Sequence, residues 1–252
     1  MRVHRLTLRA APAIALALVL GCDAATPTGP ATSAPSFSQS GGIPPLPPPS
    51  DFVAVVTNPY FPLIPGTTFT YSSVTDEGVE TNTVEVTYDT KVILGITATV
   101  VHDRVYLDGV LTEDTFDWYA QDSQGNIWYL GEQSCEIENG ACVSTEGSWQ
   151  AGVDGAQAGI LMWANPAAHK GKTYRQEFLA GEAEDMAKVL RLNASVTVPY
   201  GSFSGCLETM EWSPLEPGVR EHKFYCPGVG TVLEVQPKGG RVESELVSVA
   251  RR

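Results

Sequence analysis

The sequence predicts an all-β protein, an antiparallel meander of about twelve strands that closes into a barrel or curls into a half-barrel. A disordered proline-rich tether is expected in front of it. Three observations support this prediction. Apolar and polar residues alternate with a period of two, tight-turn signals separate the alternating stretches, and the whole pattern recurs once along the chain. Long strands with one apolar face favour closure, because a closed sheet leaves no open edge.

Residues 1–21 are predicted to be an export signal and not part of the fold. Three arginines precede an apolar run over residues 10–20, which is too short to span a bilayer. The run ends in VLGC, which resembles the lipobox of bacterial lipoproteins. This resemblance implies cleavage before Cys22, lipidation of Cys22 and anchoring to the inner or outer membrane of the cell envelope. An ordinary secretory signal with a stray cysteine is the alternative.

Residues 22–50 are predicted to be a lipidated cysteine followed by a disordered tether, because prolines among serine, threonine, alanine and glycine leave almost nothing to bury. Residues 51–252 then form the folded β domain. The formal net charge of −13 at pH 7 argues against nucleic-acid partners and against an electrostatic membrane patch. Contact with the membrane is expected through the lipid on Cys22, and the protein is expected to be a monomer.

The β domain is expected to be a tandem duplication. A shift of 106 residues places Gly95 on Gly201 and aligns the apolar alternation of residues 84–92 with that of residues 190–198. Repeat 1 covers about residues 58–130, an insert covers residues 131–164, and repeat 2 covers about residues 165–250. Two separate small domains are the alternative to a single barrel.

Turn signals divide each repeat into strands. Asp108-Gly109 predicts a two-residue hairpin turn, and residues 122–126 and 238–240 predict two further turns. The alternation of residues 186–198 predicts a half-buried strand. A helix is also compatible with this segment, but its counterpart ETNTVEVTYDTK is rich in β-branched residues, which favour strands.

Four cysteines follow Cys22, and an even number in an exported protein predicts disulfides. Cys135 and Cys142 bracket an Asn-Gly turn signal, which leaves Cys206–Cys226 as the second bond; free buried thiols are the alternative. The spacings match no zinc motif. The second bond conflicts with the Asp108-Gly109 turn, since the first-repeat counterparts of its cysteines fall three residues off register. Either the two hairpins differ in register, or one contains a bulge, or the bond is wrong.

No catalytic residue is predicted, but two kinds of side chain are candidates for a ligand site. The two-residue turn would set Asp103 opposite Asp114, on the face of Phe116 and Trp118, so that two acids meet in apolar surroundings. If the register is shifted, these aspartates would instead lie near the rim in water. Aromatic residues of both repeats could line a cavity for an apolar ligand, or simply fill the core. The candidate ligand-lining residues are Phe116, Trp118, Trp128, Trp212, Tyr225, Asp103 and Asp114.

Acidic hairpin tips are candidate cation sites. One tip carries Asp76, Glu77 and Glu80, and the other carries Glu182, Glu184 and Asp185. Calcium prefers such oxygen ligands, but no EF-hand spacing occurs, and solvated acidic turns are the alternative. No other cofactor is expected.

Three segments resemble a group of uncharacterised bacterial lipoproteins: NPYFPLIPGTTFTY, DTFDWYAQDSQGNIWYLGE and YCPGVGTVLEV. The resemblance covers most of residues 58–236. It implies an exported β protein with no established activity, and it supplies no catalytic residues. At the level of fold alone, the chain is also similar to periplasmic barrels and half-barrels that hold lipids, such as LolA-like and lipocalin-like proteins.

The leading functional hypothesis is a lipid-anchored extracytoplasmic β module, not an enzyme, that binds an apolar small molecule, a lipid or an envelope protein. A second hypothesis is a cleft hydrolase or lyase that uses Asp103, Asp114 and Asp117. A third is a structural surface lipoprotein with calcium-binding hairpin tips.

Overall fold

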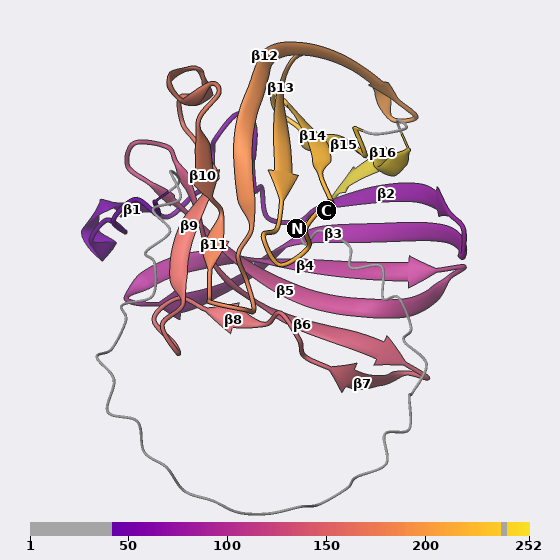
Figure 1. Ribbon diagram of the computed structural model, residues 1–252, viewed down its shortest axis with the longest axis horizontal. Coiled ribbons are helices and arrows are strands. Elements are labelled where there is room, and N and C mark those ends of the chain that lie inside the picture. Colours follow the sequence, from indigo (N-terminus) through magenta and orange to yellow (C-terminus); the bar gives the residue numbers. More distant parts are fainter. Residues whose placement is uncertain (1–41, 238–240) are drawn as a thin grey trace, which may run out of the picture. The chain divides into compact units, whose positions relative to one another are not determined.

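The computed structural model describes residues 42–237 and 241–252 (Figure 1). These residues are all-β, with two short 3-10 helices, η1 (Pro49–Asp51) and η2 (Pro166–His169). The expected export signal, Cys22 and the part of the tether before residue 42 lie outside the described residues. Within the described ranges, no helix has the length and apolar character needed to cross a membrane.

The strands are long and mostly sequential. In chain order they are β1 (Phe52–Val53), β2 (Thr67–Thr75), β3 (Gly78–Ile93), β4 (Ile96–Leu107), β5 (Val110–Asp122), β6 (Ile127–Glu138), β7 (Ala141–Ser144), β8 (Trp149–Gln150), β9 (Gln157–Met162), β10 (Thr173–Arg175), β11 (Glu177–Phe178), β12 (Met186–Val198), β13 (Gly201–Trp212), β14 (Glu221–Cys226), β15 (Gly230–Val235) and β16 (Val242–Arg251).

All these strands belong to one antiparallel sheet. Its order is β10-β12-β13-β14-β15-β16-β2-β3-β4-β5-β6-β9-β11, with β1, β7 and β8 paired at its sides. Neighbours in the sheet are mostly neighbours in the chain, as a meander requires. The last strand, β16, pairs with the first long strand, β2, so the two ends of the meander are joined there (Figure 1). The expected origin by duplication stays a prediction.

The two edge strands of the sheet, β10 and β11, belong to one short stretch of the chain, residues 173–178, called here the closing segment. β10 pairs with β12, and β11 pairs with β9, while only Gln176 separates β10 from β11. The sheet is therefore a nearly closed barrel, and the predicted all-β antiparallel fold is confirmed. Gly159 of β9 lies against this segment, because a Cβ atom there would come within 2.5 Å of the Gln176 carbonyl carbon. A larger residue at this position would push the closing segment away from β9.

Alternation along the strands produces the buried interior of the barrel. In β2, Phe69, Tyr71 and Ser73 are buried and alternate with more exposed neighbours. Interior positions elsewhere carry fully buried apolar side chains such as Leu207 and Leu246. Packing begins before residue 51, since the partly buried Leu46 already lies against the core.

The β4–β5 hairpin has a different register from the expected one. The two-residue turn is present, with Asp108 and Gly109 both at positive φ (48° and 82°). The pairing then shifts by one residue between Tyr106 and Val105, which is a β-bulge. A shift of one residue places every side chain beyond it on the other face of the strand.

The bulge changes the partners of both candidate aspartates. Asp103 lies opposite Thr115, and Asp114 lies opposite Arg104. The expectation that Asp103 faces Asp114 is therefore wrong. Asp103 and Thr115 face the barrel interior, whereas Asp114 and its neighbour Phe116 share the opposite face of the sheet.

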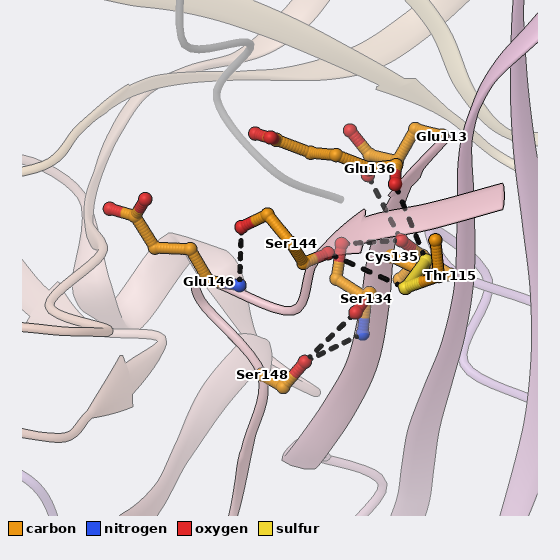
Figure 2. Close-up of a disulfide and its surroundings, with 9 residues drawn as sticks. Glu113, Thr115, Ser134, Cys135, Glu136, Ser144, Glu146 and Ser148 are labelled. Carbon is orange, nitrogen blue, oxygen red and sulfur yellow. Dashed lines mark hydrogen bonds between the residues drawn. A yellow bond between two sulfur atoms is a disulfide. The ribbon is translucent and has the colours of Figure 1, made fainter. Parts of the chain in front are cut away.

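Both expected disulfides are present, and they indicate an oxidising, extracytoplasmic compartment. Cys135–Cys142 closes the β6–β7 hairpin around the Asn139-Gly140 turn. Figure 2 shows this bond beside Ser134, whose backbone oxygen accepts a hydrogen bond from Ser148 Oγ at 3.1 Å.

The second disulfide also explains the conflict in register. Cys206 and Cys226 flank the directly paired Leu207 and Tyr225 in the β13–β14 hairpin, so they stand opposite each other. In the first half, the residue opposite Val100 is Trp118 and not Ala120. The first hairpin thus contains a bulge, and the two hairpins also differ in register.

Candidate functional site

The interior of the barrel contains ionisable side chains that are almost completely buried. Strands β13, β14 and β15 contribute the Lys223 cluster, which comprises Glu211, Glu221, Lys223 and Glu234. Lys223 is only 1% exposed. Strand alternation explains this placement, because Glu221, Lys223 and Tyr225 share one face of β14.

Direct contacts hold Glu211 in the cluster. Lys223 Nζ lies 3.3 Å from Glu211 Oε2 and 3.7 Å from Glu234 Oε1. Two hydroxyls donate hydrogen bonds to Glu211 Oε1, Tyr225 at 2.8 Å and Thr209 at 2.7 Å. One ammonium group and two hydroxyl groups thus surround this single carboxylate. Lys223 and Glu211 therefore form a buried, hydrogen-bonded ion pair.

Glu221 is the member of the cluster without such donors. It lies directly opposite Glu211 in the β13–β14 ladder. Burial, followed by the charge of Glu234 and a hydrogen bond with it, raises the pKa of Glu221 to about 10. At neutral pH its carboxyl group is therefore protonated. Its Oε2 atom has no hydrogen-bond partner among the described residues.

Lys223 remains charged despite its burial. Burial lowers its pKa, but attraction to the neighbouring acids, Glu234 first and then Glu211, outweighs this effect and raises the pKa above its ordinary value. The side chain is thus an ammonium group throughout the physiological pH range. An ammonium nitrogen has no lone pair, so Lys223 cannot attack a carbonyl group as an amine nucleophile would.

A second group of buried acids faces the same interior from other strands of the barrel. This acidic wall consists of Asp103, Asp117, Glu132 and Glu177, on β4, β5, β6 and β11. Tyr129 donates a hydrogen bond of 2.5 Å to Asp117 Oδ1. Burial, followed by repulsion from Asp185 and Glu132, raises the pKa of Glu177 well above its ordinary value.

Two residues connect the acidic wall with the Lys223 cluster. Burial raises the pKa of Tyr71, and the carboxylates of Asp103 and Glu234 raise it further, so this phenol lies within the field of both groups. Burial also raises the pKa of Asp185, while the charge of Lys223 lowers it. Ionisable groups therefore surround the interior from several strands.

Of the seven ligand-lining candidates, only Tyr225 and Asp103 face this interior. Tyr225 contacts Glu211, and Asp103 lies at the acidic wall. Whether either residue contacts a ligand stays a prediction.

The other five candidates lie on the opposite faces of their strands and make structural contacts. Phe116 stacks on His102, whose Nε2 lies 2.5 Å from Asp114 Oδ1. Lys91 Nζ lies 3.1 Å from the centre of the Trp118 ring. Trp128 donates a hydrogen bond to Asp122, and the guanidinium of Arg220 covers Trp212. These aromatic residues thus stabilise the sheet through contacts on its outer face and do not line the interior.

The acidic hairpin tips do not form a shared cation site. Glu184 accepts a hydrogen bond from the Gly181 amide and lies 3.7 Å from Arg175 Nη1, while Asp185 lies in the field of Lys223. Glu182 is exposed to solvent. Within residues 42–237 and 241–252, no group of three or more His, Cys, Asp and Glu residues is arranged to hold a metal ion, at these tips or elsewhere.

The Lys223 cluster is absent from the predicted site residues, although the sequence contains a signal for it. In β13 the interior positions are Leu207, Thr209 and Glu211, so a glutamate stands where the alternation calls for an apolar side chain. Glu221 and Lys223 occupy the same phase in β14. Charged residues in phase with buried apolar ones could have identified the cluster.

Comparisons of the chain with known protein families, with curated proteins and with solved structures found no match.

Proposed function

We propose that the protein is a lipid-anchored extracytoplasmic binding module, not an enzyme, and that its barrel interior holds a polar small molecule. The Lys223 cluster carries this proposal. Burying one ammonium among three carboxyl groups costs several kcal/mol of desolvation, which apolar side chains of similar volume would avoid. Buried groups with shifted pKa values gather at functional sites more than elsewhere.

Because the interior is polar, we propose a polar ligand in place of the apolar ligand expected from the sequence. The aromatic side chains that favoured an apolar ligand, such as Trp118 and Trp128, lie on the other faces of their strands. Carboxyl, ammonium and phenol groups project inward in their place. The lipid anchor rests on the export signal and Cys22 in the sequence, and the extracytoplasmic location rests on the two disulfides.

Catalysis has less support than binding. The hydrolase hypothesis needs Asp103, Asp114 and Asp117 to converge, but Asp114 is on the opposite face and lies 2.5 Å from His102 Nε2. A lyase that forms a Schiff base needs a neutral lysine, and the carboxylates around Lys223 keep it charged.

Native mass spectrometry of the full-length protein, extracted gently from its own membrane, tests the proposal. We expect the mass of the lipid on Cys22 and an additional small molecule that is lost on denaturation. The variant Lys223→Met should lose the small molecule, whereas Lys188→Met should keep it, because Lys188 is half-exposed and lies on β12 beside the interior-facing Ala187. A protein that carries its lipid but no small molecule would contradict the binding role.

A further inference from the structure

The Lys223 cluster carries more information about the ligand than its polarity. Glu211, Glu221 and Glu234 share one ammonium group, and two of these carboxyl groups lie within 3.7 Å of it. The third, Glu221, holds a proton in place of a cation. The cluster thus contains one carboxyl group more than its ammonium group contacts.

A buried polar atom without a partner marks a place where a hydrogen-bonding group is missing. Glu221 is 3% exposed and faces the interior, and its Oε2 has no hydrogen-bond partner in the described part of the chain. Such an orphaned atom costs about 1–3 kcal/mol, and native proteins contain few of them. Glu221 shares its proton with Glu234, so the remaining oxygen, Oε2, is an acceptor, and the missing group supplies an N–H or O–H donor.

A second orphaned atom lies along the same ladder of strands. Ser73 Oγ on β2 is buried, faces the interior and has no partner among the described residues. Ser73 follows the Glu245–Ser72 pair, and Ser244 on β16 is paired with Glu234. The unsatisfied serine therefore lies two strands from Glu234, on the side of the cluster away from β14.

We propose that the barrel interior binds a molecule with a primary ammonium group, of the diamine or polyamine class, and that this ammonium donates its hydrogen bonds to Glu221. This inference rests on the proposed function. An ammonium fits better than a metal ion, because no group of metal ligands is arranged there among the described residues. The cluster already binds one ammonium, that of Lys223, between two carboxylates.

Proton balance makes the proposal specific. In the free protein the Glu221 carboxyl group is neutral, and the arriving ligand carries its charge with it. The O–H bond of Glu221 breaks, the proton passes to the buffer, and the carboxylate that remains pairs with the ligand ammonium. One proton is released for each ammonium bound. Below the pKa of Glu221, about 10, affinity should therefore rise about tenfold for each pH unit.

Calorimetric titration of the full-length exported protein with spermidine tests this inference. The measured binding enthalpy should differ between two buffers by the difference in their ionisation enthalpies, because one proton passes to the buffer for each ligand ammonium bound. Affinity should rise about tenfold between about pH 7 and about pH 8. Glu221→Gln, which keeps the shape of the neutral carboxyl group, should bind spermidine at least about tenfold more weakly and release no proton. Its melting temperature at neutral pH should be no lower than that of the wild type, because the variant has no carboxyl group at this position that ionises on unfolding.

Glu245→Gln is the matched control, because Glu245 is a glutamate on the neighbouring β16 that precedes the interior-facing Leu246 and should bind spermidine like the wild type. Absence of spermidine binding at millimolar concentration would overturn the inference. So would binding to the wild type that releases no proton, a readout that does not depend on whether the variant folds. A neutral or anionic molecule found by native mass spectrometry would overturn this inference and leave the proposed binding function intact. An empty interior together with no spermidine binding would overturn both.

Discussion

Replacing Lys223 with methionine tests whether the interior charges are arranged as the structure shows. Methionine keeps much of the volume of the lysine side chain and removes the ammonium. The carboxylates of Glu211 and Glu234, 3.3 Å and 3.7 Å from Nζ, would lose their cation while they stay buried. The variant should therefore be much less stable than the wild type at neutral pH.

The two distances give the size of the effect. With an effective dielectric constant of about 20, the attractions are about 5 kcal/mol at 3.3 Å and about 4.5 kcal/mol at 3.7 Å. Removing the lysine also removes its desolvation penalty, which is several kcal/mol. The net loss should be about 3–5 kcal/mol, the range for breaking one side of a buried ion pair.

Urea unfolding of the exported protein, followed by tryptophan fluorescence and far-ultraviolet circular dichroism, measures this loss. Lys188→Met is the control, because it removes a half-exposed lysine on the neighbouring β12 that is not part of the Lys223 cluster. The control should change the free energy of unfolding by less than about 0.5 kcal/mol. A Lys223→Met variant as stable as the wild type would refute the arrangement of charges.

Three further predictions concern other parts of the molecule. Gly159→Ala should cost about 2 kcal/mol, because its Cβ would meet the closing segment at 2.5 Å. Thermal unfolding measures this loss, and Gly201→Ala is the control: the nearest atom to its Cβ lies at 3.8 Å, so its free energy of unfolding should be nearly unchanged. Replacing both Cys206 and Cys226 with alanine should cost about 3 kcal/mol, since the unfolded chain loses a loop of separation 20; an unchanged melting temperature would contradict this. The folded-state pKa of Glu221, about 10, exceeds its unfolded value, so its proton stabilises the fold fully below about pH 4 and progressively less as the pH rises towards 10. The free energy of unfolding should therefore fall between about pH 5 and about pH 9, and Glu221→Gln should flatten the curve; a wild-type stability that rises over this window would count against the shift.

The fold could be predicted further than the site. Period-two alternation, the Asp108-Gly109 turn and the cysteine spacing are local signals, and each is reproduced in the structure. The β-bulge was not predictable in this way. It rests on a single extra residue, Thr112, whose hydroxyl donates a hydrogen bond to the Val105 carbonyl oxygen at 3.2 Å. No pattern in the sequence distinguishes this threonine from the others in the strand.

The site depends on closure, which no local signal reports. Glu211, Glu221 and Glu234 lie in three different strands, and their shared interior exists only because β16 joins β2 and a short segment joins the other sheet ends. Alternation shows that Glu211 shares a face with Leu207. It does not show that this face looks into a barrel, so the sequence alone could not separate a buried charge from one at the rim of an open sheet.

The closing segment also sets where the barrel can open most easily. It is held by three paired residues on the β12 side and two on the β9 side, whereas eleven pairs join β3 to β4. Local stability follows the number of hydrogen bonds and contacts that must break. The closing segment can therefore separate from β9 or β12 while the long hairpins stay intact. Transient local opening of the closing segment would let water and small solutes exchange with the charged interior. The rate of this exchange would be set by a few residues around Gln176, and not by global unfolding of the protein.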